Sequence, residues 1–168
     1  YVKTLFNEAS AVVTADGQTM YFTRNNYLNK RQQYDSNGNT NLKIYRASLE
    51  NGKWKNITEL PFNSNEFNTA HPALSADGTM LYFSSDRPGT LGLTDIWRVS
   101  IHENSYGTPE NLGPEINTEA RETFPFVSSN NELYFSSDGR VGLGGLDVYG
   151  AGISPNGSFS EVQILGAP

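Results

Sequence analysis

The apolar residues of this chain fall in short runs rather than at the spacing of a helix. Runs rich in Val, Ile, Leu, Tyr and Phe are bounded by turn-forming pairs such as Asp77-Gly78, Asn51-Gly52 and Pro88-Gly89. Such runs predict β-strands, because apolar residues seldom recur three and four positions apart. In Leu81-Tyr82-Phe83 neither face is polar, so each small sheet must be covered on both sides. The pattern predicts an all-β protein.

The chain also repeats itself with a period of about 50 residues. The run 72–86 returns at 125–138, and an earlier copy occupies 11–23. Tyr82 and Tyr134 hold the same place in their copies, and their spacing is 134 − 82 = 52 residues. A recurring unit of this length favours a repeat architecture over a single irregular sheet.

Each unit is expected to contain four short strands. In the second unit they are predicted at 73–75, 80–85, 95–101 and, more weakly, 110–112. Four-stranded sheets at this period are typical of β-propeller blades, whereas a sandwich requires no such repeat. We therefore predict about three four-stranded antiparallel blades, at 7–60, 62–112 and 116–165.

Three blades would leave two sheet faces open, because propellers usually have four to eight blades. We therefore expect residues 1–168 to form a partial propeller that belongs to a larger one, six blades being one option. The alternative is that two copies of the chain close the ring.

Composition and charge exclude several classes of protein. The chain has 12 Lys and Arg against 18 Asp and Glu, a net charge of −6, which argues against nucleic-acid binding. No Cys is present, which excludes disulfides, thiolate catalysis and Cys-based zinc sites. No apolar run is long enough to predict a membrane-spanning helix. The first residues do not have the pattern of a signal peptide, although a targeting sequence could lie upstream.

Recurring aspartates are the first candidates for chemistry. Asp86 and Asp138 follow Ser-Ser, and Asp95 and Asp147 lie nine residues further on. Two carboxylates joined by a hairpin could bind a cation or act as an acid–base pair. A catalytic pair is needed only once, however, so recurrence favours carboxylates that brace each blade. The Asp-Gly turns lack the pattern of a calcium loop, and we predict no metal and no cofactor.

The two histidines are the second candidates. His71 and His102 lie 31 residues apart, and the chain has no Gly-x-Ser-x-Gly motif around a nucleophile. His71 occupies the place of Ser10 and Phe124 in the other copies, so chemistry there would be unique to one blade. We predict no catalytic residue.

The longer first copy holds the candidate for partner binding. Nine extra residues fall between Thr23 and Leu42, and residues 1–56 carry eight basic and four acidic residues. Loops rich in Arg and Tyr are frequent at interfaces. We predict a docking surface for an acidic partner, made of Arg24, Tyr27, Lys30, Arg31 and Tyr34. A solvated, disordered insertion is the alternative.

The repeat motifs resemble those of a known family. The motifs are His71-Pro72-Ala73-Leu74-Ser75-Ala76-Asp77-Gly78, the run 81–89, the inter-blade run 111–118 and Leu143-Gly144-Gly145-Leu146-Asp147-Val148-Tyr149. Together they resemble the WD40-like (TolB-type) β-propeller repeat of bacterial envelope proteins, in the version found in Bacteroidetes. The second blade is one Gly short of the family's loop, and the first blade lacks that loop.

The resemblance implies a function. Such propellers occur in periplasmic proteins of the OmpA family, associated with type IX secretion and gliding motility. It implies a non-enzymatic interaction scaffold in the periplasm or at the outer membrane, whose partners are other envelope or secretion-complex proteins. No tetratricopeptide or OmpA-like segment matches here, so the resemblance assigns peptidoglycan binding to no residue of this chain. The alternative is a glycan-binding or hydrolytic propeller that acts through its central channel.

Overall fold

The computed structural model describes residues 8–28, 31–103 and 105–166. These residues form strands joined by turns and loops, and they contain no helix that could cross a membrane. The strands are β1 (Glu8–Val13), β2 (Thr19–Asn25), β3 (Tyr27–Leu28), β4 (Arg31–Gln32), β5 (Leu42–Glu50), β6 (Lys53–Glu59), β7 (Thr69–Leu74), β8 (Met80–Ser85), β9 (Asp95–His102), β10 (Ser105–Tyr106), β11 (Glu110–Asn111), β12 (Glu122–Val127), β13 (Glu132–Ser137), β14 (Asp147–Gly152) and β15 (Gln163–Ile164).

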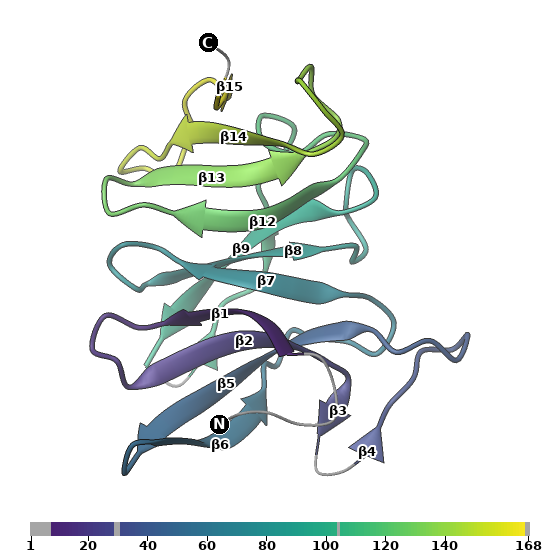
Figure 1. The fold of residues 1–168 in the computed structure, drawn as a ribbon, viewed down its shortest axis with the longest axis vertical. Helices are drawn as coiled ribbons and strands as arrows, with labels where there is room; N and C mark the ends of the chain where they lie inside the picture. Colours follow the sequence, from purple (N-terminus) through teal and green to yellow (C-terminus); the bar gives the residue numbers. More distant parts are fainter. Residues whose placement is uncertain (1–7, 29–30, 104, 167–168) are drawn as a thin grey trace.

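Three antiparallel sheets follow one another along the chain. Blade 1 has the strand order β1-β2-β5-β6, and blade 3 has the order β12-β13-β14-β15. Blade 2 has the order β7-β8-β9, and its fourth position is shared by β10 and β11, which both pair with β9. The blades stack with their first strands side by side along one face (Figure 1). The predicted fold class, all-β with three antiparallel propeller blades, is confirmed.

A bulge shapes the first strand of every blade. The pairing with the second strand shifts register at Ser10, His71 and Phe124, whose φ angles are 44°, 56° and 51°. The bulge breaks the alternation of side chains along the strand. The first strand of blade 2 was therefore predicted too short: it begins at Thr69, before the bulge, rather than at Ala73.

The Asp-Gly pairs form the hairpin turns that the sequence predicts. Gly78 has a φ of 72°, which costs little without a side chain. The Asp77 carboxylate accepts hydrogen bonds from the Ser75 hydroxyl at 2.6 Å and the Thr79 N–H at 3.0 Å. These bonds hold the pKa of Asp77 below its ordinary value, the bond from Ser75 most of all. The turn accounts for the recurring motif without a metal ion.

The apolar core lies between the blades. One cluster joins Ile96 and Tyr82 of blade 2 to Phe135 of blade 3, and a second cluster joins blades 1 and 2 around Phe83. Tyr134, the counterpart of Tyr82, is only partly buried, since no described sheet covers its side of blade 3. Two of the three clusters therefore depend on neighbouring blades, whereas a third, around Tyr45, is made of blade 1 residues alone.

Candidate functional site

Loops that join the second and third strands of the three blades lie at the same end of the molecule, on the right of Figure 1. We call this end the loop end. Six of the eleven exposed large hydrophobic residues in the described ranges belong to these loops, with exposed fractions from 50% to 98%. They are Tyr34, Leu91, Leu93, Val141, Leu143 and Leu146. Apolar side chains exposed in a group are typical of interaction surfaces.

Aspartates at the start of the third strand, buried Asp95 and partly buried Asp147, hold two of these loops in place. The Asp95 carboxylate accepts hydrogen bonds from the Leu91 N–H at 2.7 Å and from the Asn111 side chain at 2.6 Å. Asp147 accepts one from the Gly144 N–H at 2.9 Å. Because the carboxylates fix the backbone from within, the apolar side chains of the loops are left to face solvent.

The other two aspartates brace the start of the first strand. The Asn68 N–H donates to Asp86 at 2.6 Å, and the Arg121 N–H donates to Asp138 at 2.8 Å. The structural interpretation of these recurring carboxylates is therefore confirmed. Within the described ranges, no three or more His, Asp and Glu residues gather as a metal site would require.

The linker before blade 3 joins the loops of blades 2 and 3 into one surface. The Leu93 N–H donates to the Ala120 carbonyl at 2.8 Å. A Cβ added at Gly92 would lie 2.5 Å from the Thr118 carbonyl oxygen, and one at Gly139 would lie 2.9 Å from the Ala120 Cβ. Glycine at both positions lets the loops contact the linker from either side.

The blade 1 loop has a different construction. Its strands β3 and β4 pair as a small hairpin, and the Asp35 carboxylate accepts backbone hydrogen bonds from Asn37 and Asn39. The Ser36 hydroxyl donates to Glu66 at 2.9 Å. The described residues of the loop are thus held by specific bonds, which disfavours the disordered alternative.

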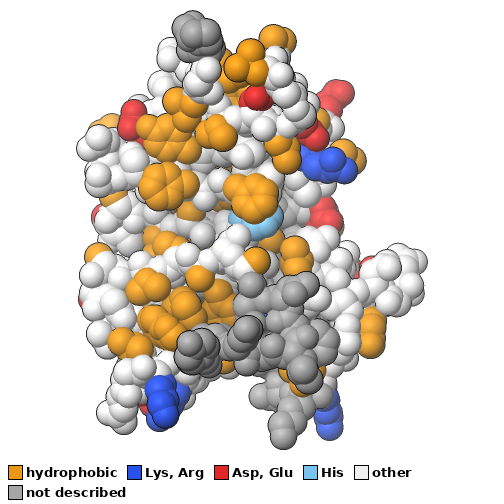
Figure 2. Space-filling model, in the orientation of Figure 1, with side chains coloured by type: hydrophobic (Ala, Val, Ile, Leu, Met, Phe, Trp, Pro, Cys, Tyr) orange, Lys and Arg blue, Asp and Glu red, His pale blue; other side chains and the backbone are white. Residues whose placement is uncertain are grey.

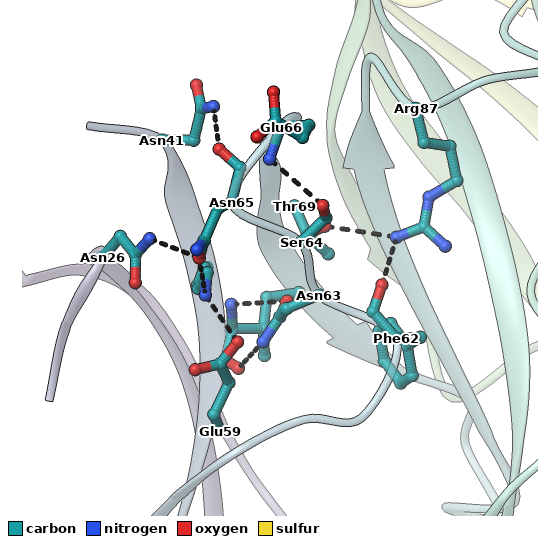
Figure 3. A network of polar contacts seen from close by, with 12 residues as sticks. Asn26, Asn41, Glu59, Phe62, Asn63, Ser64, Asn65, Glu66, Thr69 and Arg87 are labelled. Carbon is teal, nitrogen blue, oxygen red and sulfur yellow. Dashed lines mark hydrogen bonds and ion pairs between the residues drawn. The ribbon is translucent and has the colours of Figure 1, made fainter. Parts of the chain in front are cut away.

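A polar network anchors the two ends of that loop to the linker before blade 2 (Figure 3). Asn26 donates to the Asn65 side-chain oxygen at 2.8 Å, and Asn41 donates to the Asn65 carbonyl at 2.7 Å. The buried Lys43 ammonium also donates to the Asn65 side-chain oxygen, and it lies 2.6 Å from Glu59. One asparagine therefore couples the loop to the blade.

The predicted docking residues do not form one surface. Arg24 was expected in an exposed loop, and this is wrong: it lies in β2, is 3% exposed, and places its guanidinium 4.3 Å from the Tyr45 ring centroid. Arg31 and Tyr34 are exposed, and Tyr27 is partly buried in β3. Lys30 lies outside the described residues. That these loop residues bind a partner stays a prediction.

Each blade contains an arginine stacked on an equivalent pair of aromatic rings, one from the second strand and one from the third. This feature was not predicted from the sequence. The guanidinium of Arg87 lies 4.8 Å from the Phe83 ring and 5.3 Å from the Trp97 ring. Arg24 and Arg140 stack in the same way on the matching aromatic pairs of blades 1 and 3. The three arginines come two to five residues after the phenylalanine of the second strand, a pattern that could have been found.

Arg87 is also tied to the linker before blade 2, as Figure 3 shows. It donates to the Phe62 carbonyl at 3.3 Å and to the Thr69 hydroxyl at 3.1 Å. Burial lowers its pKa to about 10, so it stays charged at neutral pH. The arginine therefore stabilises the junction between blades rather than a ligand.

His71 lies on the face formed by the first strands, where Figure 2 shows hydrophobic side chains around a histidine. Its Nδ1 is 2.9 Å from the Ser84 hydroxyl and 2.8 Å from the Thr123 hydroxyl, and its ring stacks on Phe124 at 4.0 Å. Burial lowers its pKa to about 4, which keeps the imidazole neutral at pH 7. No carboxylate of the described ranges hydrogen-bonds to this ring, so His71 lacks the third group of a triad.

Comparison with known proteins identifies the fold. No family model matches the chain, and no curated protein matches its sequence. TolB from Acinetobacter baumannii is 19% identical, with a TM-score of 0.58 over 93% of this chain and 31% of that one. The fold is TolB-like.

Other solved structures share this fold. Putative TolB from Agrobacterium tumefaciens matches at 19% identity and a TM-score of 0.52, over 99% of this chain and 67% of that one. A gluconolactonase from Xanthomonas campestris matches at 15% identity and a TM-score of 0.58, over 94% and 46%. This chain thus spans about a third of the first TolB and under half of the gluconolactonase. Likeness at these identities describes the fold alone.

Proposed function

We propose that this chain is a non-enzymatic interaction module of a TolB-like propeller in the bacterial periplasm. The observation that carries the proposal is the loop end, where apolar side chains of adjacent blades are exposed together. The aspartates that could have served chemistry are bonded to backbone N–H groups instead. A surface built this way is suited to binding a partner.

The repeat motifs support a finer proposal. Their resemblance to Bacteroidetes propellers supports a role in a protein associated with type IX secretion and gliding motility, at the outer membrane and tethered to the cell wall through another domain. The partners would then be other envelope or secretion-complex proteins.

One observation favours a second candidate function. His71 interrupts the repeat, and it lies with two hydroxyls and the half-exposed Phe124 ring on the face of the first strands. A glycan-binding or hydrolytic propeller would use such a singular position. The missing carboxylate partner makes it the weaker candidate.

Photo-crosslinking in the source bacterium tests the proposal. A photoreactive amino acid is placed at Leu143 or Leu91 in the complete natural polypeptide, and at the exposed Asn130 and Ala76 on the opposite hairpins as matched controls. We expect protein adducts from the loop-end positions and few from the controls. Equal adducts at all four positions, or none at the loop end, would contradict an interaction module.

A second measurement separates the two candidates. The natural polypeptide is mixed with a panel of oligosaccharides and ester substrates, and His71→Ala serves as the comparison. The scaffold proposal expects neither binding nor turnover. Turnover that disappears in His71→Ala would establish the second candidate instead.

A further inference from the structure

The loop end of blades 2 and 3 has an acidic border around its apolar centre. Its most exposed apolar side chains are Val141 and Leu143, 98% and 73% exposed, followed by Leu93, Leu146 and Leu91. Exposed carboxylates lie in the same loops and in the linker between them. They are Asp86, Glu115 and Glu119, together with Asp138, whose side chain is partly buried.

Three arginines of the same loops and linker offset these carboxylates in part, and one of them, Arg87, is buried beside Asp86. Arg121 is exposed and lies 3.5 Å from Asp138, so it neutralises part of that one charge. Arg140 donates to the carbonyls of Glu115 and Ile116 and stacks on Phe135, which keeps its guanidinium against the blade. Along the right edge of blades 2 and 3, Figure 2 shows acidic and hydrophobic side chains close together, with a basic side chain among them.

The surface is continuous across both blades. The linker hydrogen-bonds to the blade 2 loop through Leu93 and Ala120, and Arg121 bonds to Asp138 at the start of the blade 3 loop. Leu91 and Leu143 are 143 − 91 = 52 residues apart, so they hold the same place in adjacent blades. A partner can therefore contact two equivalent apolar side chains at once.

We propose that this surface binds a basic, apolar segment of a partner protein. The inference rests on the proposed interaction function and names its chemistry: Leu and Val side chains of the loops cover the partner's apolar residues, and Glu115 and Glu119 face its Lys or Arg side chains. Charges at the border of an interface steer association and select partners by sign. An anionic lipid surface is disfavoured, because the same carboxylates would repel it.

The test extends the crosslinking at Leu143 in the natural polypeptide. Mass spectrometry locates the crosslinked residue of the partner, and the adduct yield is measured at rising salt concentration. We expect an apolar residue flanked by Lys or Arg, and a yield that falls with salt because exposed charges are screened. The Glu115→Lys/Glu119→Lys variant should lower the yield about tenfold, whereas Glu161→Lys, an exposed control outside the loop end, should leave it unchanged.

Direct binding provides an independent measurement. Two peptides of equal length and apolar content, one rich in Lys and one rich in Glu, are titrated against the natural polypeptide, together with phosphatidylglycerol vesicles. Preference for the Lys-rich peptide that is lost in Glu115→Lys/Glu119→Lys supports the proposal. Equal binding of both peptides, or binding to vesicles alone, overturns it.

The two proposals fail in different ways. Absence of any loop-end adduct rejects the interaction function itself. Protein adducts whose yield ignores salt and the charge variants, or that map to acidic segments, keep the interaction function and reject a basic partner.

Discussion

Blades 1 and 2 use side chains of opposite charge at the same corner, which is the place where the third strand begins beside the fourth. In blade 2, Asp95 at the start of the third strand accepts a hydrogen bond from Asn111 at 2.6 Å. In blade 1 the residues 52 positions earlier are Lys43 and Glu59, and the ammonium and carboxylate also lie 2.6 Å apart. The bonded pair lies at the same place in both blades, but the third strand supplies the acceptor in blade 2 and the donor in blade 1.

The loop that each corner holds explains the exchange. The short loop of blade 2 turns its backbone N–H groups toward the corner, which requires an acceptor such as the Asp95 carboxylate. The long loop of blade 1 is joined to the corner by Asn65 of the linker before blade 2, whose side-chain oxygen accepts from Asn26 of the loop and requires a donor such as Lys43 at the corner. A recurring fold position thus keeps a bonded pair rather than a residue type, and five predictions test this and other differences between the blades.

Exchanging the charge should have the largest effect. In Lys43→Asp the new carboxylate would face Glu59 at a site where the lysine side chain is 3% exposed. The free energy of unfolding should fall by about 4 kcal/mol, since one partner of a largely buried pair is lost. Urea denaturation measures the loss. Lys43→Asp/Glu59→Asn recreates the blade 2 pair and should recover part of it; no recovery would show that the two corners are not equivalent.

The stacked arginines should differ between the same two blades. Arg87 donates to Ser85, Thr69 and the Phe62 carbonyl, so Arg87→Met should lower the free energy of unfolding by about 3 kcal/mol. Arg24 has a buried Nε without a hydrogen bond in the described part of the chain. Arg24→Met should therefore cost only about 1 kcal/mol. Equal losses in urea denaturation would show that stacking, rather than hydrogen bonding, dominates.

Glycines of the two short loops extend the comparison to blade 3. Gly92→Ala should lower the free energy of unfolding by about 2 kcal/mol, because its Cβ would meet the Thr118 carbonyl at 2.5 Å. Gly144→Ala has the same place in blade 3 and meets nothing closer than 3.8 Å, so its effect should stay within about 0.5 kcal/mol. Thermal unfolding of both variants measures the difference, and a neutral Gly92→Ala would mean that the linker can shift.

His71, at the bulge of blade 2, should make the stability of the protein sensitive to mild acid, whereas the bulge residues of blades 1 and 3 should not. Burial lowers the pKa of His71 to about 4 from an ordinary 6.5, so between these values the unfolded chain binds the extra proton. The melting temperature should therefore fall as the pH is lowered from 6.5 to 4. Ser10 and Phe124 cannot titrate there, so His71→Gln should flatten this slope. A slope that persists in the variant would assign it to other groups.

The loop end should contribute least to stability. Leu143→Ser should change the free energy of unfolding by no more than about 0.5 kcal/mol, because its side chain is largely exposed. The matched control Leu133→Ser lies in the core between blades and should cost about 3 kcal/mol. A large loss of stability in Leu143→Ser would mean that this side chain belongs to the packing of the blade rather than to a binding surface.

Local patterns account for the parts of the fold that were predicted. Asp-Gly pairs specify hairpin turns through the φ angle of glycine, and recurring aspartates after Ser-Ser could be identified as braces because chemistry does not repeat in every blade. The 52-residue spacing already aligned Lys43 with Asp95. The repeat spacing alone therefore aligned the two positions at which the charges are exchanged.

The candidate surface was harder to predict. Reasoning from composition selected the basic blade 1 loop and included Arg24, which the aromatic ring of Tyr45 covers. No binding role was predicted for the apolar loops of blades 2 and 3. Whether a leucine between glycines is buried or exposed depends on which segment lies beside it, and that neighbour comes from another blade.

The architecture of one blade could be predicted from the chain alone, with its period, four strands, hairpin turns and braces, because these depend on residues within a single repeat. The tertiary structure decided which residues are buried between blades, which arginine occupies the shared aromatic stack, and which apolar side chains remain exposed at the loop end. These depend on contacts between blades, where segments about 50 residues apart meet, and no local pattern specifies the side chain that will be found there.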